Sequence, residues 1–131
     1  MPSIFSKIIN GEIPCYKIAE NDNFFAFLDV FPLVHGHILV VPKKETDYIF
    51  DIDDTNLAAM MVFAKHIAKA QKLAVPCKRI GVAVIGLEVP HAHIHLVPMN
   101  TANDLNFTQP KLSPSQQELT AMAEKIRSFL K

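Results

Sequence analysis

The chain has 131 residues, half of them hydrophobic, which is enough for one domain with its own core and too apolar for a disordered chain. Its 13 basic and 13 acidic residues give no formal net charge, and the longest basic run is Lys43-Lys44, which argues against a nucleic-acid surface. No segment approaches the roughly 20 apolar residues of a membrane span, and Cys15 and Cys77 lack the spacing of a metal or redox pair. We therefore expect a single cytoplasmic domain over residues 1–131, with no nucleic-acid or membrane partner.

The first part of the chain predicts a short helix followed by strands. Ser3 is a candidate N-cap for a helix that ends at Ile9, because Asn10-Gly11 supplies a left-handed exit. Short apolar runs between turn signals predict three strands over residues 16–19, 24–30 and 37–41. In the third of these strands, alternation places His37 on the same face as Leu39.

The next part predicts a long helix and two further strands. Helical spacing of apolar residues runs from Asp53 to about Leu73. The stretch 79–85 is almost continuously apolar, which is typical of a central strand. A turn over residues 86–90 then leads into a fifth strand that begins with a group of histidines.

The end of the chain predicts a loop and a C-terminal helix. Residues 100–112 form a polar stretch that is long enough to be a functional or partner-contacting loop. Ser113-Pro114-Ser115-Gln116 then matches a capping box with Pro114 at the first helical position. The last helix is therefore expected to begin at Pro114.

The most distinctive stretch is His91-Ala92-His93-Ile94-His95-Leu96-Val97, with three histidines at every second position. On an extended strand these imidazoles share one face, with β carbons about 7 Å apart. A group of imidazoles on one face is compatible with two kinds of chemistry. An imidazole is a nucleophile when its second ring nitrogen is held by an acceptor, and neutral imidazoles also ligate zinc. Glu88 adds a carboxylate a few residues before this group.

These residues resemble the histidine triad (HIT) family of nucleotide hydrolases and transferases, most closely its small branch of nucleoside phosphoramidate hydrolases. Residues 91–97 satisfy the H-φ-H-φ-H-φ-φ signature of that family, and the resemblance extends over about residues 3–98. The other matching segments, in order, are Ile4-Phe5, Lys7-Ile8-Ile9, Glu12-Ile13-Pro14, Phe27-Leu28-Asp29 and Gly36-His37-Ile38-Leu39-Val40-Val41-Pro42-Lys43.

The resemblance implies a role for each histidine of the site. His93 matches the nucleophile that attacks the α-phosphorus and is transiently nucleotidylated, and His91 matches the position whose backbone carbonyl orients it. His95 and His37 match residues that line the phosphate site, where backbone amides of the turn from Gly86 are further candidate donors.

The resemblance also implies a nucleotide pocket and a homodimer. Asp29 matches the carboxylate that holds the ribose hydroxyls, and no metal or other cofactor is required. Family members are generally homodimers whose sheets join across the interface, so a homodimer is expected here. The apolar slot for the base matches Ile4, Phe5, Ile8, Phe27, Leu28, Val30 and Leu39.

The chain departs from its close relatives at two places. They usually carry an Asn on the strand before the triad and a Gly-Gln-Ser type turn, whereas Gly86-Leu87-Glu88 stands here, so Glu88 is expected to replace the missing proton donor. Many bacterial relatives bind a structural zinc, but their ligand positions look like Ser3, Ser6 and Glu45 here, so no structural zinc is expected.

The sequence thus predicts an α+β, HIT-like domain with a five-stranded, mainly antiparallel sheet, a short N-terminal helix, a long central helix and a C-terminal helix. The expected reaction is hydrolysis of a nucleoside 5′-phosphoramidate or a related purine nucleotide, such as an AMP derivative, through a covalent intermediate on His93. Two alternatives are a metal-dependent hydrolase that uses the triad as ligands and a nucleotide-binding regulatory module with little turnover.

Overall fold

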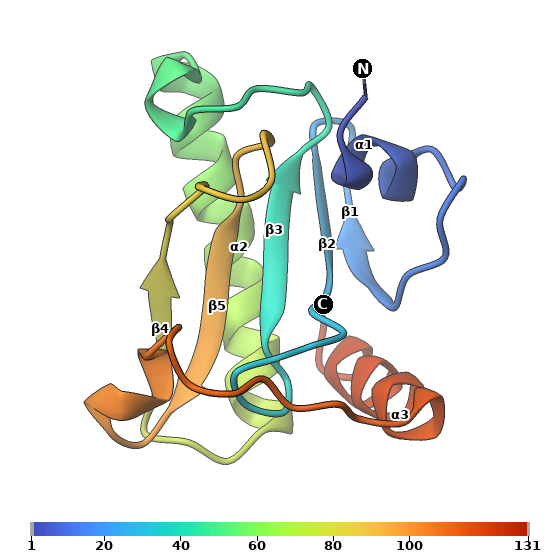
Figure 1. Ribbon diagram of the computed structural model, residues 1–131, viewed down its shortest axis with the longest axis vertical. Helices are drawn as coiled ribbons and strands as arrows, with labels where there is room; N and C mark the ends of the chain where they lie inside the picture. Colours follow the sequence, from blue (N-terminus) through green and yellow to red (C-terminus); the bar gives the residue numbers. More distant parts are fainter. Residues whose placement is uncertain (1, 131) are drawn as a thin grey trace.

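The protein is described by a computed structural model that covers residues 2–130. Five strands form one antiparallel sheet in the order β1-β2-β3-β5-β4. The strands are β1 (Lys17–Glu20), β2 (Phe24–Leu28), β3 (Ile38–Pro42), β4 (Arg79–Ala83) and β5 (Ile94–Met99). The helices are α1 (Ile4–Ile9), α2 (Asp54–Ala74) and α3 (Gln116–Arg127), with short 3-10 turns at Ile49–Asp51 and Ala102–Leu105. The expected α+β class is confirmed, and Figure 1 shows α2 crossing behind the sheet.

Local sequence signals explain where the helices begin and end. The Ser3 hydroxyl accepts from the Ser6 N–H and caps α1, and Gly11 follows the helix with a φ of 81°. The Asp53 carboxylate accepts from the Asn56 N–H and caps α2. No helix within residues 2–130 is both long enough and apolar enough to cross a membrane.

The sheet separates two apolar clusters. On the α2 side, alternate residues of the strands, among them Ile38, Val40 and Ile94, pack against α2 and α3. On the opposite side, Leu39 packs in a smaller cluster with Phe5 of α1. Because side chains alternate along a strand, His37 and Leu39 share the α1 side as expected, and this is the side on which the histidines gather.

The position of β4 differs from the sequence prediction. The apolar stretch 79–85 was expected to form a central strand, but β4 ends at Ala83 and pairs only with β5, so it is an edge strand. Val82 is 48% exposed and Leu87 is 90% exposed. Apolar composition alone does not distinguish a central strand from an edge whose apolar face is left open.

Other element boundaries also differ from those expected: β1, β2 and β3 are displaced or shortened by one or two residues at their ends, and the starts of α3 and β5 differ as follows. The N-cap of α3 is Ser115, whose hydroxyl accepts from the Glu118 N–H while the Glu118 carboxylate accepts from the Ser115 N–H. Ser115 and Glu118 form the capping box, so Pro114 precedes the helix. Strand β5 begins at Ile94, so His91 and His93 lie just before it. The Ala92 N–H donates to the carbonyl of Thr46 instead of to a ladder partner.

Candidate active site

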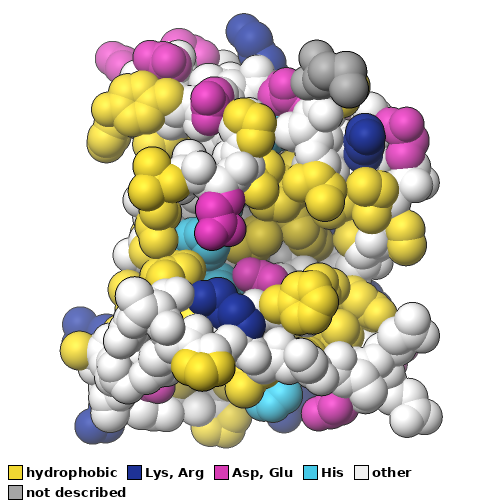
Figure 2. Space-filling model, viewed as in Figure 1, with side chains coloured by type: hydrophobic (Ala, Val, Ile, Leu, Met, Phe, Trp, Pro, Cys, Tyr) yellow, Lys and Arg dark blue, Asp and Glu magenta, His cyan; other side chains and the backbone are white. Residues whose placement is uncertain are grey.

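A cavity of about 350 Å³ lies on the α1 side of the sheet, and its floor is made by His93 and His95. Figure 2 shows histidine side chains recessed in a hollow of this face, with charged side chains around its rim. The other residues around the cavity are Phe5, Asp29, Leu39, Ile85, Gly86, Leu87, Glu88, Val89, Phe107 and Lys111.

His93 is held by the chain immediately before it. Its Nδ1 lies 2.8 Å from the carbonyl oxygen of His91, and because a carbonyl only accepts, Nδ1 carries the proton. In the neutral ring the lone pair then lies on Nε2. The ring also packs edge-on against Phe5, with 5.0 Å between centroids, which fixes its orientation. The arrangement gives a buried imidazole with one nitrogen free toward the cavity.

His37 and His95 form a second, linked arrangement. The Leu33 N–H donates to His37 Nδ1 over 3.1 Å, so the proton of neutral His37 lies on Nε2. His37 Nε2 lies 2.9 Å from His95 Nδ1 and donates to it. His95 Nδ1 is therefore an acceptor, and His95 Nε2–H is left as a hydrogen-bond donor at the cavity.

Burial keeps these two imidazoles uncharged. It is the main cause that lowers the pKa of His37 to about 3, with smaller contributions from the charges of His95 and Lys111. Burial likewise lowers the pKa of His95 to about 4, followed by the effects of His93 and Lys111. Because both rings are neutral near pH 7, each has a fixed donor and a fixed acceptor nitrogen.

His91 is anchored to the N-terminal helix. Its Nε2 donates to the carbonyl of Pro42 over 2.8 Å, so its Nδ1 accepts from the Ser3 hydroxyl at 2.7 Å. Glu45 Oε1 in turn accepts from the Ser3 N–H and from the Ser6 hydroxyl. These hydrogen bonds lower the pKa of Glu45 to about 2, so the carboxylate stays ionised. The positions compared with zinc ligands thus come together as a hydrogen-bonded network.

Asp29 stands at the end of β2 beside the histidines. Its Oδ1 accepts from the Phe31 N–H over 2.9 Å, and its Oδ2 lies 3.9 Å from His37 Nε2. Burial raises the pKa of this carboxyl. Within residues 2–130, Asp29, His37 and His95 are also the one group whose ligand atoms lie close enough together to hold a metal ion, and His93 is outside it.

The residues expected around a base divide into three groups. Phe5 and Leu39 line the cavity, and Phe27 and Ile8 pack behind them in the same apolar cluster. Leu28 lies in the cluster on the α2 side, so its side chain is separated from the cavity by the sheet. Two others, Ile4 and Val30, are largely exposed and do not line the cavity.

Sequence reasoning missed Phe107 and Lys111, which line the cavity from the segment after β5. The Phe107 ring packs on His95 with 4.7 Å between centroids. The length of the polar stretch 100–112 was the only signal for them, since no residue pattern indicated which side chains turn inward.

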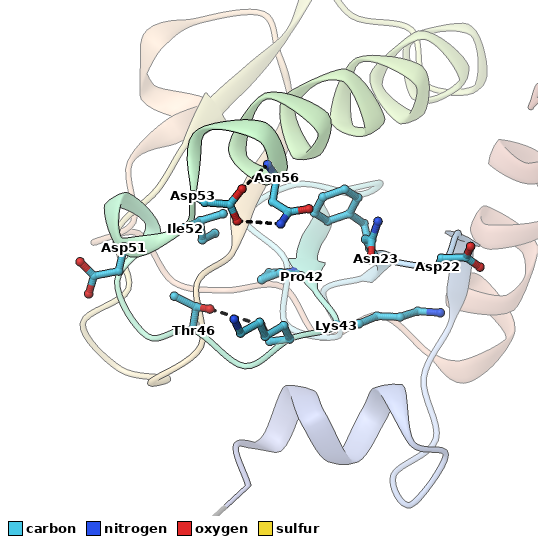
Figure 3. Close-up of a pocket in the computed structure, with 11 residues that line it drawn as sticks. Asp22, Asn23, Pro42, Lys43, Thr46, Asp51, Ile52, Asp53 and Asn56 are labelled. Carbon is cyan, nitrogen blue, oxygen red and sulfur yellow. Dashed lines mark hydrogen bonds between the residues drawn. The ribbon is translucent and has the colours of Figure 1, made fainter.

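Another hollow of about 500 Å³ lies at the N-terminal end of α2, and Figure 3 shows its lining. Its polar groups are largely engaged within the protein: Asp53 accepts from Asn56, and Lys43 pairs with Glu20 at 2.8 Å. Asp51 and Asp22 lie at opposite ends of it. It has no convergent set of free groups comparable to the imidazoles, so the histidine cavity is the candidate active site.

Comparison with known proteins identifies the family of the chain. The family described as HIT domain matches residues 10–102. The adenosine 5′-monophosphoramidase hnt1 of Schizosaccharomyces pombe is 32% identical over 137 aligned positions that span all of both chains. The adenosine 5′-monophosphoramidase HNT1 of Candida albicans is 30% identical, with 97% of this chain and 90% of the relative covered.

Solved structures are similar over nearly the whole chain. The crystal structure of a Hit-like protein involved in cell-cycle regulation from Bartonella henselae has a TM-score of 0.84 at 32% identity, covering 98% of this chain and 96% of that one. A zinc-bound histidine triad family protein from Mycobacterium smegmatis has a TM-score of 0.82 at 26% identity, covering 96% and 91%. The protein belongs to the HIT family.

Proposed function

We propose that the protein hydrolyses nucleoside 5′-phosphoramidates or related purine nucleotides, such as AMP derivatives, through a covalent nucleotidyl intermediate on His93. The observation that carries this proposal is the 2.8 Å contact from His93 Nδ1 to the His91 carbonyl, which leaves Nε2 as the nucleophilic nitrogen. Relatives that are 30% and 32% identical and named adenosine 5′-monophosphoramidases support the substrate class.

The reaction takes place in two displacements at phosphorus. His93 Nε2 attacks the α-phosphorus, the bond from phosphorus to the leaving nitrogen breaks, and the amine departs with a proton. Water then attacks the same phosphorus and returns a proton to the group that protonated the amine, the bond to Nε2 breaks, and the nucleoside monophosphate is released with the imidazole restored. Splitting the hydrolysis in this way replaces one difficult displacement by two easier ones.

Neutral donors stabilise the charge that develops on the phosphoryl oxygens. His95 Nε2–H is the side-chain donor, and the chain from Leu33 through His37 keeps its proton on that nitrogen. Backbone amides of the turn that begins at Gly86 are the candidate donors from the opposite wall of the cavity. Asp29 is the candidate acceptor for the ribose hydroxyls, and Phe5 and Leu39 supply an apolar wall for the base.

Glu88 is the proposed proton donor to the departing amine, because it is the carboxyl group of the wall formed by residues 85–89. Glu88→Gln should slow hydrolysis of an adenosine phosphoramidate with an alkylamine leaving group by about 10- to 100-fold. It should have little effect on the p-nitrophenyl ester of AMP, whose leaving group needs no proton. Equal rates for wild type and variant with the amine substrate across pH would contradict this role.

Trapping the intermediate tests the proposed function itself. The protein is mixed with adenosine 5′-phosphoramidate, quenched within the first turnover and measured by intact-mass spectrometry. We expect an added adenylyl group on the wild type and none on His93→Ala, which should still bind AMP. Adenylation of the His93→Ala variant, or hydrolysis by wild type with no adenylated species, would overturn the mechanism. AMP binding without any turnover would favour the regulatory module instead.

The Asp29, His37 and His95 cluster keeps metal-dependent hydrolysis as a second candidate. A metal there would have to break the 2.9 Å hydrogen bond between the two imidazoles, because their facing nitrogens would become ligands. Dialysis against a strong chelator distinguishes the two mechanisms. The histidine mechanism predicts unchanged kcat, whereas the metal mechanism predicts loss of activity and recovery on adding the metal.

We also propose a homodimer that is joined at β4, because one edge of this strand has no partner strand in the sheet. Val82 of the edge strand β4 is 48% exposed, and Val84 and Ile85, which follow this strand, are 40% and 45% exposed. A second copy would pair this edge and cover the apolar side chains. Sedimentation equilibrium should give twice the chain mass for wild type and the chain mass for Val82→Asp; a monomeric wild type would contradict the proposal.

A further inference from the structure

The segment between β5 and α3 runs back across the lower end of the sheet, in orange and red in Figure 1. It is held at both ends. The Asp104 carboxylate accepts from the N–H groups of Asn100 and Thr101, and the Leu112 N–H donates to the carbonyl of Pro32 over 2.9 Å. The residues between these anchors therefore have a defined position beside the histidines.

Phe107 and Lys111 form one unit within this segment. The Phe107 ring packs on His95 at 4.7 Å and on His37 at 6.3 Å between centroids. Lys111 Nζ donates to the Phe107 carbonyl over 2.8 Å and lies 5.6 Å from the centroid of the Phe107 ring. The ammonium group is thereby tied to the same aromatic ring that contacts His95 and its hydrogen-bond partner His37.

Among the described residues that line the cavity, Lys111 is the only lysine or arginine. The other titratable side chains there, apart from the histidines, are the acids Asp29 and Glu88, which supply no positive charge. His37 and His95 are neutral near pH 7, so they offer dipoles and no net charge. Within residues 2–130, Lys111 makes no ion pair that would neutralise it. A bound phosphate needs a positive charge that these imidazoles do not supply.

We propose that Lys111 binds the phosphoryl oxygens of the nucleotide and makes the site selective for substrates with an anionic phosphate. The proposal rests on the nucleotide-directed function argued above and adds a residue to it. Lys111 acts as a flexible point charge at the mouth of the cavity, and Phe107 sets the position from which it reaches the phosphate.

Paired binding measurements with AMP and adenosine test this role, because the two ligands differ only by the phosphate. We expect Lys111→Gln to weaken AMP binding about 10- to 100-fold in calorimetry and to leave adenosine binding unchanged. Lys111→Arg should keep most of the AMP affinity, because it keeps the charge. Lys125→Gln, which removes an exposed lysine of α3, is the matched control and should bind both ligands as wild type does.

The dependence of AMP affinity on salt concentration is a second test, because a purely structural role of Lys111 would not change it. The AMP affinity of wild type should fall with added NaCl, and that slope should be smaller in Lys111→Gln. Equal AMP affinity in wild type and Lys111→Gln overturns the proposal. So does an equal loss of AMP and adenosine binding, which would mean that Lys111 only supports the wall. If wild type binds neither ligand, the proposed function fails, and this inference fails with it.

Discussion

His37 and His95 share a hydrogen bond of 2.9 Å between Nε2 and Nδ1, and the direction of that bond is set by the Leu33 N–H behind it. The first histidine therefore determines which nitrogen of the second carries the proton. His95 is a donor toward the cavity and not a base. His37, which contacts no substrate in the proposed mechanism, thus makes His95 a hydrogen-bond donor to the phosphate.

Replacing His37 by Phe keeps an aromatic ring and removes the N–H that fixes His95. We expect kcat for adenosine 5′-phosphoramidate to fall about 10- to 100-fold with a small change in KM, because the donor is needed mainly when charge develops. His35→Phe, two residues earlier at an exposed position, is the control and should keep wild-type kcat. An unchanged kcat in His37→Phe would mean that the direction of this bond does not matter for turnover.

Acid should destabilise the fold through the same two histidines. Their folded-state pKa values of about 3 and about 4 lie below the unfolded value of 6.5, so unfolding takes up protons as pH falls below 6.5. Each histidine should then reduce the free energy of unfolding by about 2 kcal/mol between pH 7 and pH 5. Urea denaturation across that range measures how the free energy of unfolding changes with pH, and His37→Asn should make that change smaller. A stability that is flat from pH 7 to pH 5 would contradict both pKa values.

Gln71 of α2 should matter for turnover although it lies on the other side of the sheet. Its buried amide donates to the carbonyls of Gly36 and Leu96, which adjoin the two linked histidines, over 2.8 and 2.9 Å. Gln71→Met should lower the free energy of unfolding by about 1–3 kcal/mol and also reduce kcat, because the two strands lose a shared anchor. Gln117→Met, at an exposed position of α3, should change neither quantity.

The loss of kcat separates an effect on positioning from one on stability alone. The measurement is made well below the midpoint of thermal unfolding, where both proteins are fully folded. Wild-type kcat in a destabilised Gln71→Met protein would show that the anchor serves only the fold.

The Ser3 and Glu45 network predicts low affinity for zinc at the N-terminal helix. Serine hydroxyls stay protonated and are poor zinc ligands, and here they already donate to His91 Nδ1 and to Glu45. Protein incubated with excess zinc and dialysed should retain far less than one ion per chain by atomic emission. A stoichiometric ion that Ser3→Ala and Glu45→Gln both remove would contradict this interpretation.

The same network should stabilise the fold directly. Ser3→Ala removes the cap of α1 and the partner of His91 Nδ1, so it should lower the free energy of unfolding by about 1–2 kcal/mol. Ser113→Ala, at an exposed position before α3, should have almost no effect. Equal midpoints of denaturation for the two variants would show that the network carries no stability.

Much of the fold was predictable because the local signals were strong. The cap at Ser3, the left-handed Gly11 and the helical spacing that leads into α2 all depend on neighbours in sequence. The triad spacing likewise indicated His93 and His95 on one side of the sheet, and both line the cavity. These features need no knowledge of distant contacts.

What the sequence did not predict depends on partners far along the chain. The edge position of β4 follows from the strand order, which its apolar residues do not encode. The start of α3 was misplaced because Ser113 with Gln116 and Ser115 with Glu118 both fit a capping box, and the carboxylate gave the stronger cap. Lys111 lines the cavity from a segment whose end is held by the hydrogen bond of Leu112 to Pro32, a contact between residues far apart in sequence.

The contacts that define the candidate site join residues 58 positions apart for His37 with His95 and 88 apart for Ser3 with His91. Because these pairs close long loops, a partly folded chain lacks the hydrogen bonds that join them, although the contact of His93 with the His91 carbonyl is local. Recovery of enzymatic turnover after dilution from denaturant should therefore report the fully native population, and it should lag behind the recovery of helix measured by circular dichroism.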